Sequence, residues 1–324
     1  STFTTGIFRT FYGYGDTAAA AQLAASLLAF VILLVLLERY SRRRARYHSA
    51  AESRARADLI PLSGSKAIMA CVICLSPLMF GFIIPATQLL FWAVFEAEPL
   101  GWDFVGLAWN SFSLAFLAAI IAVILAIILS YAKRTKPIKP VRTVLAMAGF
   151  GYALPGTIIA IGVLIPLAWL DHRLIDIFGS WGWDSPGLLL SGSLVALLFA
   201  YTVRFLAVAI GSVQSGLEKV KPSLDQAGRS MGHSPLDILR KIHVPLMRSS
   251  ILTAVLIVFV DVLKELPATL ILRPFNFNTM AVRAYELASD ERLVDAAPAS
   301  IMIVLVGLIP VLMLHASIAR RRPH

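Results

Sequence analysis

VGLAWNSFSLAFLAAIIAVILAIILSY, at residues 105–131, is a run of 27 residues without a charged side chain. An α-helix rises 1.5 Å per residue, so about 20 apolar residues are enough to cross the hydrocarbon core of a bilayer. Similar runs flank it at residues 17–37, 67–90, 143–169, 187–211, 250–272 and 298–318. The sequence therefore predicts an all-α fold, a polytopic bundle of about seven transmembrane helices.

The composition also indicates a membrane protein. Hydrophobic residues are 58% of the chain and charged residues only 15%, which leaves too little polar surface to cover a water-soluble globule. The net charge of +10 is compatible with a nucleic-acid partner, but no DNA-binding motif is present and the basic residues follow the predicted spans instead. We therefore expect the chain to contact the lipid bilayer and no nucleic acid.

The basic residues fall on alternate sides of the predicted spans. Of the 29 Lys and Arg residues, only five lie in the segments on one side of the predicted spans, and 22 lie in the alternate segments 38–66, 132–142, 212–249 and 319–324. Short cytosolic loops carry an excess of Lys and Arg. This asymmetry predicts that Ser1 lies outside the membrane and that His324 lies in the cytosol.

The two ends of the chain resemble each other. Residues 1–50 align without gaps with residues 275–324 at nine identical positions. These positions include polar residues ahead of the apolar run, such as Arg9, which aligns with Arg283. We interpret the match as the same unit closing two successive modules.

The repeat divides the chain into three parts. Residues 1–37 are then the last span of a preceding module, residues 38–66 a basic cytosolic linker, and residues 67–324 a complete six-helix module. An equally good interpretation of 38–66 is a solvated basic segment that only anchors the topology.

Within the longest cytosolic segment, residues 223–245 predict two short helices that meet at Gly232. Ser223 and Gln226 have the spacing of a capping box for the first helix. The second helix has a strong start signal in Ser234, Pro235 and Asp237. Its apolar stripe consists of Leu236, Leu239 and Ile242. A helix pair with an apolar stripe outside the bilayer favours a protein partner, or alternatively a position on the lipid interface.

The spacing of six residues in this pair carries a family resemblance. Gln226-Ala227-Gly228, Gly232, Ile242 and Pro245 resemble the E-A-A, three residues, G, nine residues, I-x-L-P signature of binding-protein-dependent ABC importer permeases. Gln226 stands where the signature has Glu, and Asp225 lies just before it.

The resemblance implies the ABC importer type I permease fold in a bacterial inner membrane. It also implies a cytosolic ABC ATPase dimer as partner, with residues 225–228, Gly232, Ile242 and Pro245 coupling the two, and a periplasmic substrate-binding protein. No G-x-x-x-x-G-K-[ST] phosphate loop occurs in the chain. We therefore expect a transport permease that binds no cofactor itself and is not an enzyme, with ATP used by the partner subunit.

The run at 250–272 contains Asp261, Lys264, Glu265 and Pro267, which are costly in the middle of a membrane. Asp261 is three residues from Lys264 and four from Glu265, so a continuous helix would gather all three on one face. We expect this face to line the translocation pathway or a gate; a buried charge network that holds helices together is the alternative. Arg204, in the preceding run, either extends toward the cytosol or pairs with Asp261.

The sequence around Glu265 carries a second resemblance. Residues 264–270 and 272–277 resemble the K-E-L-P-x-T-L and L-R-P-F stretches of ferric-iron permeases in the same superfamily, which are often two fused modules. The resemblance implies transport of ferric iron and a C-terminal part of a fused permease, whose other module is a further partner. Fe(III) prefers oxygen ligands, so Asp261 and Glu265 are metal candidates, although no motif defines a coordination sphere. A phosphonate, polyamine or sulfate permease, and a secondary transporter or channel, remain alternatives.

Overall fold

The computed structural model describes residues 2–44, 62–99, 101–183 and 187–319, and every regular element in these ranges is helical. The α-helices are α1 (Phe3–Phe8), α2 (Thr17–Arg44), α3 (Ser65–Leu78), α4 (Ile84–Phe91), α5 (Trp102–Thr135), α6 (Lys139–Ala148), α7 (Gly156–Ser180), α8 (Leu194–Glu218), α9 (Pro222–Ser230), α10 (Pro235–Ile238), α11 (Val244–Leu246), α12 (Arg248–Leu263), α13 (Pro267–Leu272), α14 (Met280–Ser289) and α15 (Leu293–Ala319). The predicted all-α class is confirmed.

The long helices correspond to the predicted spans. Five continuous helical segments are long and apolar enough to cross a membrane: Thr17–Glu38, Ser65–Glu96, Trp102–Thr135, Gly156–Ser180 and Leu194–Glu218. Helix α12 and helix α15, which contains the apolar stretch Leu293–Leu308, occupy the places of the last two. The chain is therefore a multi-pass membrane protein.

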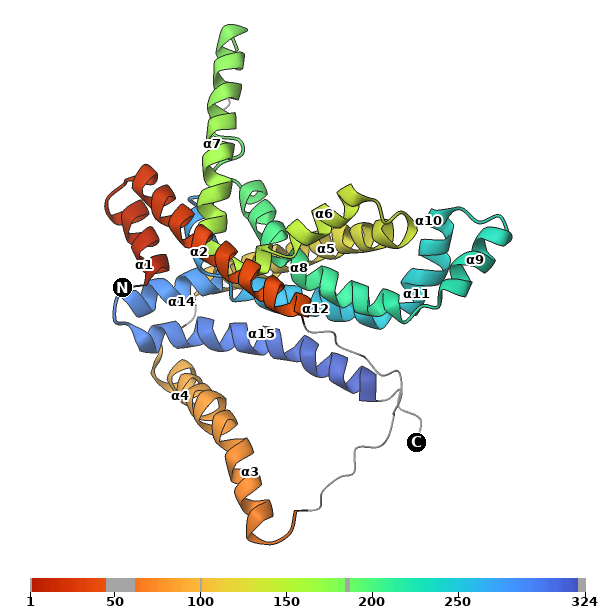
Figure 1. Ribbon diagram of the computed structural model, residues 1–324. Helices are drawn as coiled ribbons and strands as arrows, with labels where there is room; N and C mark the ends of the chain where they lie inside the picture. The colour runs from red at the N-terminus through yellow and green to blue at the C-terminus, as the bar shows by residue number, and fades with distance from the viewer. Residues whose placement is uncertain (1, 45–61, 100, 184–186, 320–324) are drawn as a thin grey trace.

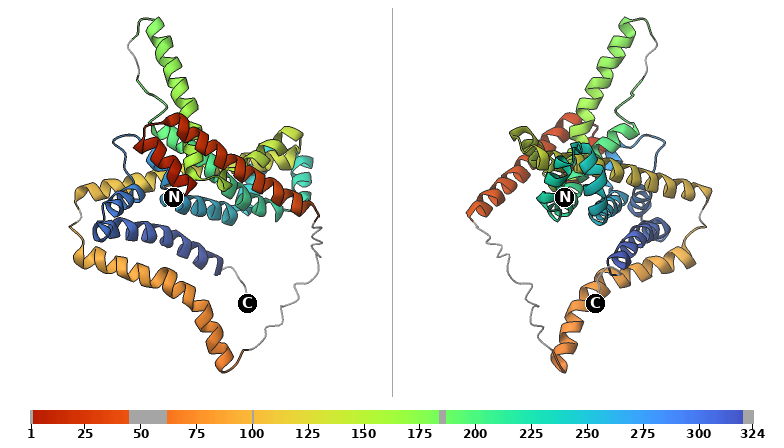
Figure 2. Two further views of the ribbon diagram at one scale, coloured as in Figure 1. Left: turned by 60° about the vertical axis from the view of Figure 1, so that its left-hand side comes forward. Right: turned by 90° about the vertical axis from the view of Figure 1, so that its right-hand side faces the viewer.

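Helices α5, α8 and α12 pack against one another and form the centre of the bundle (Figures 1 and 2). The contact surfaces of α5 and α8 are rich in alanine. Buried examples are Ala115, Ala118, Ala119, Ala122 and Ala126 on α5 and Ala196, Ala200 and Ala209 on α8. Small side chains allow helix backbones to approach closely, which is how helices associate where lipid removes the hydrophobic driving force.

The predicted span at 143–169 is wrong in its boundaries. Residues 139–148 form the separate amphipathic helix α6, a 3₁₀ turn follows at Gly151–Ala153, and α7 begins only at Gly156 and continues to Ser180. Pro155 has an extended ψ of 142°, which ends helical geometry before α7 starts. Hydropathy does not detect such a break, because the residues on both sides of it are apolar.

The N-terminal helices pack against the side of α7 (Figure 1). They repeat the arrangement at the other end of the chain, where short α14 is followed by long α15. With the alignment offset of the sequence repeat, Thr17–Arg44 of α2 corresponds to residues 291–318, within two residues of the bounds of α15 at each end. The repeat in the sequence therefore has a counterpart in the order and length of the helices.

Candidate functional site

The predicted helix pair, now α9 to α11, projects at the end of the molecule opposite α14 (Figure 1). Helix α9 begins at Pro222 with Lys221 as its N-cap and no side-chain cap, so the predicted capping box of Ser223 and Gln226 is wrong. Proline suits the first helical position because its φ is already helical, and here it starts the helix one residue before Ser223. Gly232 has a φ of +80°, a left-handed conformation that favours glycine.

The second helix of the pair starts as predicted. Ser234 Oγ accepts a hydrogen bond from Asp237 N at 3.2 Å. Helix α10 then continues through a π-helical turn, Leu239–His243, into α11 without a break. A bend of 77° follows before α12, so α9–α11 lie across the end of the bundle.

The two helices of the pair touch at Gly228. A Cβ atom added there would lie 2.9 Å from Ile238 Cγ1 and 3.6 Å from Ile242 Cδ1, so no larger side chain fits without moving α10. Gln226, Ala227 and Pro245, in contrast, are exposed. The exposed large apolar residues of the pair are Leu224, Met231, Leu236 and Leu246. Gly228 and Gly232 thus shape the pair and Ile242 lies beside Gly228, whereas the remaining signature residues are on its free surface.

Asp225 points into the pair rather than toward its free surface. Its Oδ2 lies 2.7 Å from Arg134 Nη2 of α5, and its Oδ1 lies 2.5 Å from Nε2 of the fully buried His243. Burial works against ionisation, but the hydrogen bonds from Arg134 and His243 outweigh it and hold the pKa of Asp225 below its ordinary value. Asp225 is therefore an internal anion that joins α5, α9 and the turn after α10, and it does not replace the missing signature Glu on the surface.

The charged residues of the sixth span lie at a helix break. Helix α12 ends at Leu263 and α13 begins with Pro267 at its first turn, so the predicted continuous span at 250–272 is wrong. Lys264 Nζ lies 2.9 Å from Asp261 Oδ1, as the spacing predicted. Glu265 lies beyond the end of α12 and does not share this ion pair.

Glu265 pairs with Arg204 instead, at 3.4 Å between Oε2 and Nε. Neither interpretation of Arg204 from the sequence, extension toward the cytosol or pairing with Asp261, is correct. Glu265 Oε1 also accepts from Ala268 N, and its carbonyl oxygen accepts from Thr269 Oγ1 at 2.6 Å. Thr269 Oγ1 lies 2.5 Å from the hydroxyl of the buried Tyr201. A chain of polar contacts thus links α8 to the break between α12 and α13.

Gly156, the first residue of α7, lies close against this ion pair. A Cβ on Gly156 would lie 2.3 Å from Glu265 Oε1 and 2.6 Å from Arg204 Nη1. Three helices therefore meet at one buried pair of charges. The sequence contained no local signal for Gly156, Tyr201 or Thr269, because their contacts join segments that lie far apart in the chain.

The two metal candidates do not form a cluster. Among the described residues, no group of three or more His, Cys, Asp or Glu side chains lies close enough to hold a metal ion. Asp261 and Glu265 are each paired with a different cation, Lys264 and Arg204. What the arrangement can do is hold helices in one relative position.

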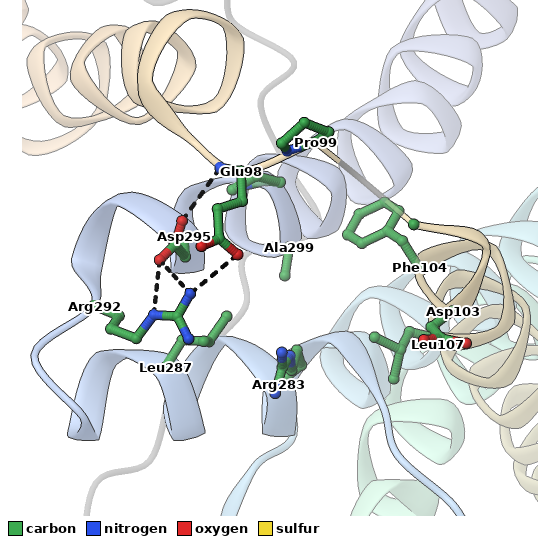
Figure 3. Close-up of a pocket in the computed structure, with 12 residues that line it drawn as sticks. Glu98, Pro99, Asp103, Phe104, Leu107, Arg283, Leu287, Arg292, Asp295 and Ala299 are labelled. Carbon is green, nitrogen blue, oxygen red and sulfur yellow. Dashed lines mark hydrogen bonds and ion pairs between the residues drawn. The ribbon is translucent and has the colours of Figure 1, made fainter.

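An ion network on the predicted external side was also missed by sequence reasoning. Arg292 lies 2.8 Å from Asp295 Oδ2 and 3.3 Å from Glu98 Oε2, and Glu98 N donates to Asp295 Oδ1 (Figure 3). These residues line a cavity of about 180 Å³ between the start of α5, α14 and α15. The network ties the segment before α5 to the first turn of α15.

The comparisons with known proteins agree with this geometry. Residues 138–322 match the family described as binding-protein-dependent transport system inner membrane component. The chain belongs to this family. The recognition from the spacing of residues 226–245 is thereby confirmed, and the family is one of transport permeases rather than enzymes.

Individual permeases and a solved transporter structure are also similar to this chain. The Fe(3+)-transport system permease protein FbpB 2 of Haemophilus influenzae is 26% identical over 318 residues, which cover 97% of this chain and 60% of the relative; this chain thus spans about 60% of that length. The putative 2-aminoethylphosphonate transport system permease protein PhnV of Salmonella typhimurium is 23% identical over 63% of this chain and 72% of its own. A bacterial ABC transporter involved in the import of the acidic polysaccharide alginate shares the fold, with a TM-score of 0.55 at 13% identity over 79% of this chain and 96% of that one.

Proposed function

We propose that this chain is a permease subunit of an ATP-driven ABC importer, in which α9–α11 dock on a cytosolic ATPase. The observation that carries the proposal is the helix pair itself. Its shape depends on Gly228 and Gly232, while Gln226, Ala227 and apolar residues such as Leu236 remain exposed. A surface of this kind outside the bilayer suits a protein partner. A secondary transporter or channel would leave the pair without a role.

The proposed gate is the break between α12 and α13. Lys264 keeps a side chain that is 64% exposed although it lies in a membrane-spanning segment, and a charge in that position faces water at far lower cost than lipid. The buried pair of Arg204 and Glu265 joins α8 to the same break. Rocking of α8 against α12–α13 would open or close the path beside Lys264.

The proposed solute is ferric iron delivered by a periplasmic binding protein. The resemblance at residues 264–277 and the relative from Haemophilus influenzae support this substrate. The second candidate is a phosphonate, because the relative from Salmonella typhimurium is named for 2-aminoethylphosphonate transport. In both cases the N-terminus of this chain is periplasmic and its C-terminus cytosolic, as the distribution of basic residues predicts.

A second permease module completes the proposed pathway. Helices α1 and α2 repeat the arrangement of α14 and α15, which supports their assignment as the end of a preceding module. Residues 38–66 would then connect the modules, and residues 67–324 would form the second one. The segment 45–61 of this linker lies outside the described residues.

The decisive test changes Gly232 to Val. A β-branched residue at a φ of +80° is strained, so we expect the ATPase to co-purify less well and ATP-dependent uptake to fall. The matched control is Gly182→Val, which meets the same positive φ of +72° far from the pair and should leave ATPase association intact. Uptake of labelled iron and of labelled 2-aminoethylphosphonate then separates the two substrates. Unchanged ATPase association and uptake in Gly232→Val would reject the docking proposal.

A further inference from the structure

Residues at the C-terminal end of α5 contact both helices of the pair α9–α11. Arg134 donates from Nε to Asp225 Oδ2 of α9 at 2.8 Å. One turn earlier, the hydroxyl of Tyr131 donates to the carbonyl oxygen of Pro235, the first residue of α10, at 2.7 Å. The ring of Tyr131 also stands edge-on to His243, with 5.3 Å between the ring centroids. Helix α5 thus contacts the start, the middle and the end of the pair.

Arg134 also holds the end of α8. Its Nη1 donates to the carbonyl oxygen of Leu217 at 2.6 Å, and its Nη2 donates to that of Val220 at 2.8 Å. The last carbonyls of a helix have no partner within the helix. The planar guanidinium of Arg134 satisfies one of them, at Leu217, together with the carbonyl of Val220 just beyond the helix, while it also pairs with a carboxylate. One side chain therefore ties α5, the end of α8 and α9 together.

The order of the helices along the chain explains why the contact of Tyr131 and Arg134 with the pair matters. The pair follows α8 directly through residues 219–221 and continues into α12 through Met247, whereas α6, α7 and α8 separate it from α5 along the chain. Helix α5 nevertheless packs along both α8 and α12 through the bundle. A movement of the pair therefore pulls α8 and α12 directly, whereas it reaches the cytosolic end of α5 through Tyr131 and Arg134.

The side chains that join α5 to the pair have little exposure to solvent. The side chains of Arg134 and Asp225 are 18% and 16% exposed, and His243 is 0% exposed. Ion pairs with little exposure are screened less than those on the surface, and loss of one partner leaves the others buried and unpaired. By contrast Lys133, next to Arg134, is exposed and has no ion pair in the described part of the chain.

We propose that Tyr131 and Arg134 are positioning residues that carry the movement of α9–α11 to α5, so that α5, α8 and α12 move as one body. This inference rests on the ATPase docking proposed above. It adds a third helix to the two that the chain connects to the pair. It also assigns a role to Asp225 as the receiver of that link.

The test uses the complete transporter, with its ATPase and binding protein, in proteoliposomes. The variants are Arg134→Gln, Arg134→Lys and Tyr131→Phe, with Lys133→Gln as the matched control on the same helix turn. Lysine keeps a cation near Asp225 but cannot hold the carbonyls of Leu217 and Val220 together with it. The measurements are the yield of assembled complex, the ATP hydrolysis stimulated by binding protein, and the amount of solute taken up per ATP.

We expect uptake per ATP to fall at least about fivefold in Arg134→Gln, the lower end of typical coupling between sites, and less in Arg134→Lys and Tyr131→Phe. ATP hydrolysis per assembled complex should stay near wild type even where the yield of complex falls, and every property of Lys133→Gln should be unchanged. A residue that only stabilises the fold would lower complex yield, hydrolysis and uptake in parallel, and that result would overturn the inference. Should Arg134→Gln fail to assemble, unchanged uptake per ATP in the two milder variants would overturn it as well. Wild-type uptake that does not depend on ATP would instead remove the docking proposal itself.

Discussion

Replacement of Glu265 by Gln tests whether the buried pair with Arg204 holds the bundle together. The two side chains are 6% and 19% exposed, so solvent screens them little. Gln is nearly the same shape and can still accept from Ala268 N, so the change removes mainly the charge. The change leaves the guanidinium of Arg204 without its counter-ion, and removal of one partner of a buried ion pair costs about 3–5 kcal/mol, so we expect a loss near the lower end of this range. Glu265→Ala, which also empties the site, should cost about 3–5 kcal/mol.

Equilibrium unfolding of the purified protein in mixed detergent micelles measures these losses. Glu286→Gln is the matched control, because Glu286 pairs with Arg273 at 3.0 Å but is 33% exposed. An ion pair of that exposure contributes at most about 1 kcal/mol. The single variant Arg204→Gln and the double variant Arg204→Gln/Glu265→Gln complete a thermodynamic cycle with wild type and Glu265→Gln. In this cycle the second change should cost less than it does alone.

Two results would contradict the reasoning. Additive costs in the cycle would mean that Arg204 and Glu265 do not interact in the folded protein. A Glu265→Gln variant as stable as wild type, but with uptake abolished, would mean that the carboxylate acts on the solute and not on the helices. Both results can be obtained from the same set of four proteins.

Two further predictions concern the helix pair α9–α11. Gly228→Val should overpack the contact with Ile238, which lies 2.9 Å from the added Cβ, at a cost of about 1–3 kcal/mol, and should weaken ATPase pull-down. The control is Gly211→Val, where an added Cβ meets nothing within 4 Å. Equal ATPase binding by the two variants would reject the contact. Because the folded pKa of Asp225 is lowered, its contribution to stability is complete above its unfolded value of about 3.9 and is lost as the pH falls through the folded pKa. Unfolding measured at pH 7 and through this acid window should show a smaller pH dependence in Asp225→Asn.

The sequence predicted the features that depend on local patterns. Apolar runs identify helices that cross a membrane because length and hydropathy are local properties. Gly232 and Ser234 were recognised because a left-handed turn and an N-cap each require particular residues at one position. The spacing around them was sufficient to identify the family. Hydropathy did not give the helix boundaries, since helices end before Pro155 and before Pro267 inside apolar runs.

Partners of charged side chains could not be predicted from the sequence. The interpretation of Asp261, Lys264 and Glu265 assumed one continuous helix, and the end of α12 at Leu263 separates Glu265 from the other two. Glu265 then meets Arg204, 61 positions earlier in the chain.

Asp225 shows the same limit in the segment on which the family assignment rests. The sequence by itself determined that residues 223–245 form a helix pair with the spacing of a permease signature. Only the tertiary structure decided that Asp225 faces inward, because Arg134 comes from a helix 91 positions away and meets it only once α5 and α8 have packed. Spacing along a chain specifies which residues share a helix face, whereas the partner of a buried charge depends on which helices pack together.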